Sequence, residues 1–521
     1  RIAQALGLSP EHPSRIEAGI VFALNETINQ GHVYVPKGML VQRAIELLGV
    51  SHELLPAGLE RLEKQERIRQ EKLPRPNGRD DEIMDVVYLM PLYWGEVGVA
   101  ERIKALTKAQ SPLFLQEELP QTGLELSDEQ EQAVKMALEH PVSILTGGPG
   151  TGKTTCLKAL IATLDHQKKR YGLASPTGRA AKRLSEATGS PASTIHRLLE
   201  FSPVDGFKRN PDNPLNVDFL VVDEASMLDL LLTNHLLKAL RPGTHLLFVG
   251  DIDQLPSVGA GDVLRDLIES KVAAVTRLET IFRQAEDSQI ITNAHRINQG
   301  QTPFFAKGEQ GDFYLFPAED AAAAADWVVD VVTERIPQTF GFDGLGDIQV
   351  LSPLYRGPAG VTILNERLQE KLNPPAQGKA EKSLYGTIFR VGDKVMQTRN
   401  NYDKLVYNGD IGFIQGIDLV NQTLAVDFEG HPAEYEWSEA DELTLAYAVS
   451  VHKAQGAEFP VIVMPVVTQH YMMLQRNLIY TAITRARNLC VLTGNMKAIG
   501  MAVRNNKVAQ RFSALEMRLR V

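Results

Sequence analysis

Cysteine is almost absent from this chain. Cys156 and Cys490 are the two cysteines among its 521 residues. Two cysteines cannot build a disulfide framework, and no C-x-x-C pair indicates a zinc site. We therefore expect two buried, reduced thiols and a reducing, cytoplasmic setting.

Long apolar runs and a surplus of positive charge are missing as well. No apolar stretch approaches the roughly 20 residues of a membrane helix, so no membrane partner is expected, and residues 1–15 contain no apolar signal core. Because the first residue is Arg1 and not Met, we expect a piece of a longer chain. The formal net charge is −10, so any nucleic acid would have to be held by local cationic grooves and not by bulk charge.

What the chain does contain is an alternation of short apolar strands and helical stretches. This alternation is typical of α/β domains, in which helices cover both faces of a parallel sheet. A first series comprises VSILTG (142–147), YGLASP (171–176), FLVVDEAS (219–226) and HLLFVGD (245–251). A second series comprises DIQVLSP (347–353), FPVIVMPVV (459–467) and LCVLTG (489–494).

Two segments of different composition flank or interrupt these series. Residues 1–118 are mostly helical and end in a strand, a loop and a strand, which resembles a winged helix. Residues 366–441 are rich in Gly and Asp with short alternating strands, which predicts a small antiparallel barrel. The predicted domains are an N-terminal domain (1–118), a first sheet domain (119–275), a second sheet domain (276–365 and 442–521) and the inserted barrel (366–441).

A glycine-rich loop follows the first strand and opens a helix. Its sequence, GGPGTGKT (147–154), fits G-x-x-x-x-G-K-[ST]. Consecutive backbone N–H groups can curl around a phosphate there, Lys153 can reach the β- and γ-phosphates, and the Thr154 hydroxyl can ligate Mg²⁺. The loop therefore predicts a nucleoside triphosphate site, whose contacts would be Gly148, Pro149, Gly150, Thr151, Gly152, Lys153, Thr154 and Thr155.

Acidic and amide side chains stand at the ends of the next two strands. Asp223 and Glu224 end FLVVDEAS, where the first carboxylate can take Mg²⁺ and the second can polarise an attacking water. Gln254 follows HLLFVGD, and its carboxamide can both donate to a γ-phosphate oxygen and accept from water. Hydrolysis is thus predicted, with Glu224 as the base and Gln254 as a sensor.

An ordered series of motifs extends these observations over about residues 126–521. The motifs are LSDEQEQAV (126–134), GGPGTGKTT (147–155), ASPTGRAAKRL (174–184), TIHRLL (194–199), VVDEAS (221–226), GDIDQLPSVGAGDVL (250–264), IFRQ (281–284), VSVHKAQGAEFP (449–460) and YTAITRAR (480–487). The series resembles the motif ladder of superfamily 1 DNA helicases, and it is most similar to the RecD-like branch. The long N-terminal extension resembles the stand-alone RecD-like helicases more than the RecD subunit of the RecBCD recombination complex.

The resemblance implies a fold and an activity. The two sheet domains would be RecA-like and the inserted barrel SH3-like. ATP and Mg²⁺ would be the cofactors, single-stranded DNA and duplex forks the partners, and travel 5′→3′ with unwinding the activity, in DNA repair or recombination. We expect a nucleoid-associated monomer, with partners of a recombination complex as an open possibility.

Individual residues carry over motif by motif. Gln130 would read the adenine, Glu458 would lie near the ribose, and Arg283 and Arg485 would approach the γ-phosphate from the second sheet domain. A guanidinium fixed there would stabilise the charge that spreads over the phosphoryl oxygens in the transition state. Contacts with the single strand are implied for Pro176, Thr177, Gly178, Arg179, His196, Ser352, Pro353, Ser450, His452 and Lys453, although a lone histidine such as His196 or His452 is as often structural.

Alternatives remain at two points. Residues 200–216 correspond to the β-hairpin pin that splits the duplex in RecD-like helicases, but their turn-rich composition equally fits a surface loop. The chain could also be a motor subunit that works only within a recombination nuclease complex. A P-loop switch or small-molecule kinase would not need the second sheet domain with YTAITRAR.

Overall fold

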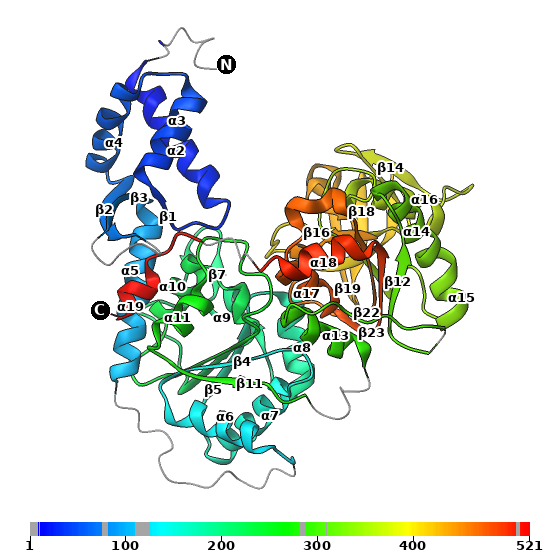
Figure 1. The fold of residues 1–521 in the computed structure, drawn as a ribbon, viewed down its shortest axis with the longest axis horizontal. Coiled ribbons are helices and arrows are strands. Elements are labelled where there is room, and N and C mark those ends of the chain that lie inside the picture. Colours follow the sequence, from blue (N-terminus) through cyan, green and yellow to red (C-terminus); the bar gives the residue numbers. More distant parts are fainter. Residues whose placement is uncertain are drawn as a thin grey trace.

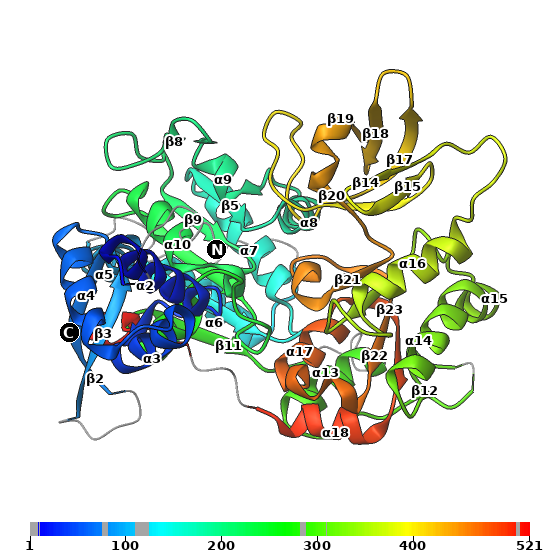
Figure 2. The same cartoon turned by 90° about the horizontal axis from the view of Figure 1, so that it is seen from above.

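The computed structural model describes residues 9, 11–75, 82–109, 124–281, 288–308, 310–506 and 511–520. Two sheet-bearing lobes lie side by side, and the N-terminal part of the chain stands on the first lobe (Figure 1). Seen from above, the antiparallel barrel rises from the second lobe next to helix α8 (Gly178–Thr188) of the first (Figure 2). The predicted α/β class, with two parallel sheets, an inserted barrel and a helical N-terminal part, is confirmed.

The first lobe is built on a six-stranded sheet in which every pairing is parallel. Its strands, from edge to edge, are β11 (Ala274–Leu278), β4 (Val142–Gly147), β10 (His245–Gly250), β9 (Phe219–Val222), β5 (Tyr171–Ser175) and β6 (Ser193–Thr194). Strands β4, β9 and β10 are buried along their whole length. That burial explains why they are continuous apolar runs in the sequence.

Alternate residues of these strands pack against helices on opposite faces. Leu145 and Val249 join the core under helices α6 (Asp128–Glu139), α7 (Lys153–His166) and α8. Ile144 and Phe248 join the core on the other face, under the remaining helices. Those helices are α5 (Met90–Lys108), α9 (Ile195–Leu198), α10 (Leu230–Lys238) and α11 (Val263–Ser270).

The second lobe repeats the plan with a five-stranded parallel sheet. Its strands, in order, are β12 (Phe313–Pro317), β23 (Ala486–Gly494), β22 (Phe459–Val466), β13 (Ile348–Ser352) and β21 (Ala448–Ser450). The helices around it are α13 (Gln289–Asn298), α14 (Ala321–Asp330), α15 (Ile336–Phe340), α16 (Val361–Leu372), α17 (Arg476–Ile483) and α18 (Met496–Arg504). A π-helical turn, Val331–Arg335, joins α14 to α15.

The inserted barrel contains five antiparallel strands, β19 (His431–Glu436), β18 (Thr423–Phe428), β17 (Ile411–Asp418), β16 (Lys394–Gln397) and β20 (Leu443–Leu445), beside the hairpin β14 (Glu381–Leu384) and β15 (Thr387–Arg390). Its edges differ from the predicted 366–441. Residue 366 lies inside α16, which packs on the second lobe. Leu445 pairs with Val395, so the barrel sheet needs β20, which begins after residue 441.

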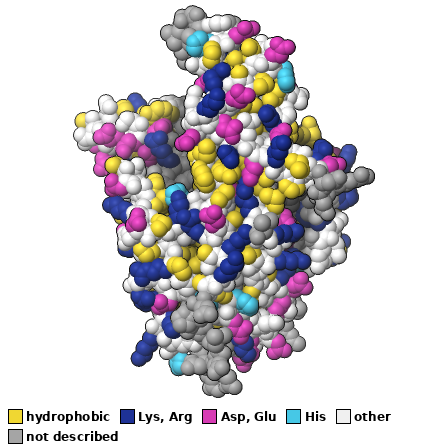
Figure 3. Space-filling model, turned by 90° about the vertical axis from the view of Figure 1, so that its left-hand side faces the viewer, with side chains coloured by type: hydrophobic (Ala, Val, Ile, Leu, Met, Phe, Trp, Pro, Cys, Tyr) yellow, Lys and Arg dark blue, Asp and Glu magenta, His cyan; other side chains and the backbone are white. Residues whose placement is uncertain are grey.

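The N-terminal part combines helices with a small antiparallel sheet of order β1-β3-β2. Its strands are β1 (Tyr34–Pro36), β2 (Ile68–Pro74) and β3 (Ile83–Leu89), and its helices are α2 (Pro13–Ile28), α3 (Lys37–Leu48) and α4 (Leu55–Lys64). The two long strands match the two predicted strands, and most of the loop predicted between them lies outside the described residues. On the face shown in Figure 3, basic and acidic side chains are intermixed, and neither sign forms a continuous field.

Two predicted domain limits are wrong at the edges of the first lobe. The limit at 275 cuts β11, whose residues Ala274–Leu278 pair with β4 and therefore belong to the first sheet. The C-terminal residues 511–520, assigned to the second domain, return to the first lobe, where α19 (Leu515–Arg520) packs in the core that contains α5 and α11. The buried carboxylate of Glu96 fixes α19 by accepting hydrogen bonds from Arg518 and from the Ala514 N–H.

The predicted pin region contains one short hairpin. Strands β7 (Phe201–Ser202) and β8 (Gly206–Phe207) pair antiparallel, and Val204 at the turn is 91% exposed. The rings of Phe201 and Phe207 pack on each other and on His196. The remainder of 200–216 contains no regular strand, so the hairpin is shorter than the predicted segment.

Candidate functional site

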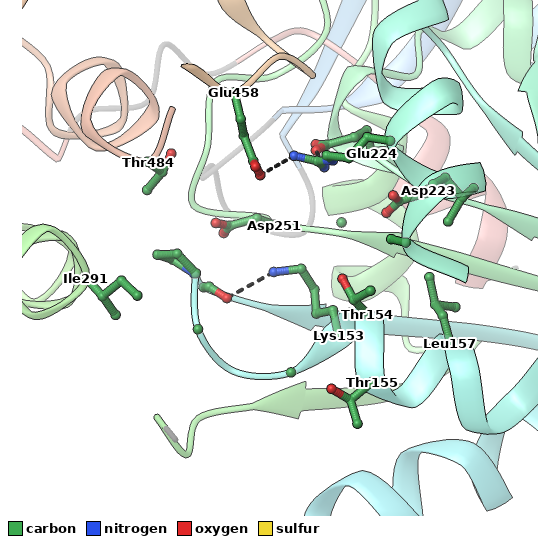
Figure 4. A pocket seen from close by; sticks show the side chains of 18 of the residues that line it. Lys153, Thr154, Thr155, Leu157, Asp223, Glu224, Asp251, Ile291, Glu458 and Thr484 are labelled. Carbon is green, nitrogen blue, oxygen red and sulfur yellow. Dashed lines mark hydrogen bonds and ion pairs between the residues drawn. The ribbon is translucent and has the colours of Figure 1, made fainter. Parts of the chain in front are cut away.

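A cavity of about 880 Å³ lies between the two lobes, within the size range of small-molecule sites. Figure 4 shows Lys153 and Thr154 at the start of α7, with Asp223, Glu224 and Glu458 around the same space. Thirteen of the residues predicted to bind or hydrolyse a nucleotide line this cavity. They are Gln130, Gly148, Pro149, Gly150, Gly152, Lys153, Thr154, Thr155, Asp223, Glu224, Gln254, Glu458 and Arg485.

The glycine-rich loop connects the buried end of β4 to the first turn of α7. Gly150 and Gly152 have φ angles of 75° and 85°, in the left-handed region that residues with a Cβ avoid. The Lys153 ammonium donates to the carbonyls of Gly147 (2.6 Å) and Gly148 (2.9 Å). Thr151, also predicted as a contact, does not line the cavity; it is buried and its hydroxyl donates to Gly148. Its side chain thus holds the loop in shape.

The second lobe closes tightly on this loop. A Cβ on Gly148 would lie 3.0 Å from the His295 ring and 3.1 Å from the Tyr480 hydroxyl. The His295 ring also lies 3.2 Å from the carbonyl oxygen of Pro149. A glycine at 148 is therefore needed for close approach of the lobes.

The two acids at the end of β9 are in different electrostatic environments. Burial raises the pKa of Asp223 to about 6, with the neighbouring Glu224 charge adding to the rise. Burial also acts to raise the pKa of Glu224, but the charges of Arg183, Arg485 and Lys153 hold it below its usual value. Glu224 is therefore the acid that stays ionised, the state that a base needs.

The donor set beside the loop fits Mg²⁺. The Thr154 hydroxyl and the Asp223 carboxylate line one cavity, and Mg²⁺ prefers such oxygen ligands, completed by water and phosphate. Thr154 and Asp223 are thus suited to hold the ion.

Gln254 lies at the same cavity and is linked to the second lobe through Asp251. Its amide donates to Asp251 Oδ2 (3.3 Å), and the Tyr480 hydroxyl donates to the same oxygen (2.7 Å). Two further bonds cross at this point, from the Leu255 N–H to Thr481 Oγ1 (2.8 Å) and from Gln455 Nε2 to the Leu255 carbonyl (2.7 Å). The loop after β10 is therefore an inter-lobe joint.

Of the two arginines predicted to approach the nucleotide from the second lobe, one is found at the cavity. Arg485 lines it and is 2% exposed, with its guanidinium donating to the carbonyls of Thr481 and Ala457 (both 3.3 Å). Glu458 lines it too and pairs with Arg487 (3.0 Å). Arg283 lies outside the described residues.

Gln130 also lines the cavity and has a second role. Its side-chain oxygen accepts from the Ser127 N–H (3.1 Å) and the Ser127 hydroxyl accepts from the Gln130 N–H (3.3 Å), forming a capping box at the start of α6. Since the oxygen is used by the cap, the amide NH₂ is the group left to donate to a base.

The predicted DNA contacts gather from both lobes beside α8. Thr177 caps this helix, its hydroxyl accepting from the Ala180 N–H (3.3 Å). A Cβ on Gly456 would lie 2.8 Å from Thr177 Oγ1, and the Arg179 guanidinium lies 5.5 Å from the centre of the Phe459 ring. Segment 450–459 of the second lobe therefore runs along α8.

The barrel reaches over the same residues. Arg179 and Lys182 form ion pairs with Glu429. Lys453 donates to Asn408 Oδ1 (2.6 Å). Arg179 and Lys453, the two cationic groups predicted to hold a strand, are thus paired with polar groups of the barrel.

Other predicted DNA contacts are placed differently. Ser352 and Pro353 are buried, and the Ser352 hydroxyl donates to the carbonyls of Leu354 (3.0 Å) and Ala359 (2.8 Å). Ser450 is also buried and caps the 3-10 turn Val451–Ala454, which contains His452. Burial lowers the pKa of both His452 and His196, and His196 packs on the hairpin rings. For Ser352 and Pro353 the structure shows a turn-forming role, because their side chains do not reach the surface.

Comparison with known proteins agrees with this architecture. An AAA domain model matches residues 130–260, the SH3 domain of ATP-dependent RecD-like DNA helicases matches 364–428, and the UvrD-like helicase C-terminal domain matches 445–493. The ATP-dependent RecD2 DNA helicase of Deinococcus radiodurans is 32% identical over 99% of this chain and 70% of its own length. The chain belongs to the RecD-like helicase family.

Two further comparisons were found. The RecD subunit of the RecBCD enzyme of Mycolicibacterium smegmatis is 31% identical over 84% of this chain and 82% of that protein. A solved Pif1 helicase from Bacteroides, in complex with ADP-AlF3 and single-stranded DNA, is 19% identical, covers 73% of this chain and 94% of its own, and has a TM-score of 0.45. Within the described part of this RecD-like helicase, no helix could cross a membrane.

Sequence reasoning missed four charged residues of the cavity in this RecD-like helicase. They are Glu125, Arg183, Asp251 and Arg487, which all line it. Each stands within or next to a motif whose neighbouring residues carry the predicted function. Burial is not a signal common to them, because Asp251 is 2% exposed whereas the Arg487 side chain is 53% exposed. What they share is a place at the cavity between the lobes, which no local pattern of the sequence indicates.

Proposed function

We propose that this chain is an ATP-driven motor that moves 5′→3′ on single-stranded DNA and unwinds duplex at forks, as a nucleoid-associated enzyme of DNA repair or recombination. The observation that carries the proposal is the composition of the inter-lobe cavity. The first lobe contributes Lys153 and Glu224, and the second contributes Arg485 and Glu458. Family membership supports the same activity.

The residues divide the reaction between the lobes. Lys153 and the loop N–H groups would hold the phosphates, and Glu224 would take the proton of the attacking water. Mg²⁺ bound at Thr154 and Asp223 would neutralise charge on the β- and γ-phosphates. Arg485 would stabilise the charge of the transition state from the other side, and Arg283 is proposed for the same role on its motif alone.

Because the charged groups belong to two lobes, nucleotide binding would favour the closed cleft and product release the open one. The segments predicted to contact DNA lie on both lobes, Thr177 to Arg179 on the first and His452 with Lys453 on the second. Opening and closing of the cleft would therefore change the distance between the two sets of residues that contact the strand. Repeated cycles would move the protein along it.

The experiment measures ATP turnover with and without single-stranded DNA, then unwinding of duplexes that carry a 5′ or a 3′ tail. We expect turnover to rise with the strand and unwinding to require the 5′ tail. Turnover indifferent to single strands would contradict the motor, and unwinding from the 3′ tail would contradict the direction.

A second candidate is a motor subunit that acts only inside a recombination nuclease complex. The similarity to the RecD subunit of Mycolicibacterium smegmatis over 82% of that protein favours it. Size-exclusion chromatography with a fork-unwinding assay separates the two. Unwinding by a lone monomer supports the stand-alone motor, whereas a monomer that hydrolyses ATP without unwinding supports the subunit.

A further inference from the structure

Arg183 of α8 bridges two carboxylates inside the cavity. One terminal nitrogen, Nη2, contacts Glu224 Oε1 at 2.5 Å, and the other, Nη1, forms an ion pair with Glu458 Oε1. The Arg183 side chain is 26% exposed and that of Glu224 is 8% exposed. One guanidinium therefore joins the proposed catalytic base of the first lobe to the proposed ribose-side carboxylate of the second, and Figure 4 shows the contact with Glu458.

The helix that carries Arg183 also carries the predicted DNA contacts of the first lobe. Arg179 stands four residues earlier, on the same face of α8 and about 6 Å along its axis. Gly178 is the first residue of the helix and Thr177 its cap. A hydrogen-bonded helix of 11 residues moves as a unit, so a displacement at Thr177 to Arg179 is transmitted to Arg183.

Glu458, the partner of Arg183 from the second lobe, is likewise close in the chain to predicted DNA contacts. Glu458 ends the segment that contains His452 and Lys453, and this segment follows α8 closely. The Gly456 backbone lies against Thr177, Phe459 lies under Arg179, and Glu458 reaches Arg183. Arg183 and Glu458 thus each lie a few residues from side chains predicted to hold the strand.

We propose that Arg183 is a positioning residue that makes hydrolysis depend on single-stranded DNA. Without a strand, its guanidinium occupies the Glu224 oxygen that would otherwise accept the proton of the attacking water. When a strand binds at Thr177 to Arg179, α8 shifts, the guanidinium stays with Glu458 alone, and Glu224 is released. This inference rests on the proposed function, because it assumes that the strand stimulates hydrolysis.

The test is Arg183→Ala, assayed at saturating ATP with and without single-stranded DNA. The charges of Arg485 and Lys153 remain in this variant and still act to lower the pKa of Glu224. We therefore expect DNA-free turnover to rise at least about fivefold, the stimulated rate to change less, and the KM for ATP to stay within about threefold. A general structural defect does not raise turnover, so the gain distinguishes positioning from damage. Arg170→Ala is the matched control: Arg170 is an exposed arginine of the same lobe that pairs with Asp218 (2.7 Å), and it should leave both rates unchanged.

Glu458→Gln tests the other half of the bridge. With its second carboxylate neutralised, Arg183 stays on Glu224, so the ratio of stimulated to DNA-free turnover at saturating ATP should fall. Arg183→Lys should restore part of the DNA dependence, since one ammonium can contact Glu224 but cannot bridge both carboxylates.

The outcomes separate this inference from the proposed function. If wild-type turnover is indifferent to the strand, the proposed function fails. If the wild type is stimulated and Arg183→Ala keeps the same ratio of stimulated to DNA-free turnover, the proposed role of Arg183 is refuted and the proposed motor function is retained. Loss of both rates in Arg183→Ala also refutes the proposed role of Arg183, because Arg183 would then be required for hydrolysis itself.

Discussion

Tyr480 and Gln254, one from each lobe, donate to the same oxygen, Oδ2 of the buried Asp251. Tyr480 belongs to α17, which ends shortly before Arg485, and Gln254 lines the nucleotide cavity. Asp251 is thereby a shared acceptor through which the sensor side chain and the arginine-bearing element are held in one geometry. We therefore expect a movement of the Gln254 side chain to be transmitted to the second lobe through the Asp251 carboxylate.

Tyr480→Phe should lower ATP turnover about tenfold at saturating ATP. The substitution removes one donor from a buried carboxylate, which costs about 1–3 kcal/mol, and the cost falls on the closed cleft. DNA affinity, measured by fluorescence anisotropy, should be unchanged. Tyr471→Phe is the control, because Tyr471 is a 62% exposed tyrosine of the same lobe. Equal rates in both variants would show that the hydrogen bond from Tyr480 to Asp251 does not support hydrolysis.

Gln254→Ala should reduce both hydrolysis and unwinding while DNA affinity stays. Gln254 lines the cavity, is 9% exposed and donates its amide to Asp251, so we expect it to connect the sites without holding the strand. Turnover, unwinding rate and anisotropy on the same preparation check this. Unwinding at the normal rate would remove Gln254 from the sensor role.

Glu224→Gln should bind ATP and DNA but hydrolyse ATP at least about 100-fold more slowly, since a positioned base contributes about 10²–10⁴-fold. Lys153→Ala should instead lose nucleotide binding together with turnover, because its ammonium is the cation of the phosphate loop. Binding of a fluorescent ATP analogue separates the two variants. A Glu224→Gln protein with near-normal turnover would assign the base to another group.

Arg518→Ala should lower the thermal midpoint and expose the C-terminal residues to protease. The substitution leaves Glu96, which is fully buried, without its cation. Breaking a buried pair costs about 3–5 kcal/mol, and we expect the lower end because Tyr88 and the Ala514 N–H still donate to Glu96. Arg520→Ala on the same helix removes an exposed arginine and should leave the midpoint nearly unchanged.

His245 should make the first lobe sensitive to acid. Burial lowers the pKa of its imidazole to about 4, against about 6.5 in an unfolded chain. The unfolded state then binds more protons between these values, so stability is full above about pH 6.5 and is lost as the pH falls toward about 4. The loss at about pH 5 is about 2 kcal/mol.

His245→Gln removes this titration, so its thermal midpoint should fall less than that of the wild type between about pH 7.5 and about pH 5. His166→Gln, at an exposed histidine of the same lobe, is the control. Parallel midpoint curves for His245→Gln and the wild type would show that His245 does not govern the acid response.

Local sequence determined the chemistry of the phosphate loop and the ends of the buried strands. GGPGTGKT forms its turn from residues that are neighbours in the chain, and strands such as β4 and β10 are apolar throughout because both faces are covered. Parallel strands then bring their carboxyl ends to one edge of the sheet, so the sequence alone is enough to group Lys153, Glu224 and Gln254.

The tertiary structure alone decided which charged groups meet. Arg183 and Glu458 are 275 positions apart, and the burial of Ser352 depends on the turn that its hydroxyl closes. Strand β11 and the C-terminal helix α19 join the first lobe through partners far away in the chain. Burial and pairing of this kind depend on contacts between distant segments and between lobes, whose energy no local pattern of residues encodes.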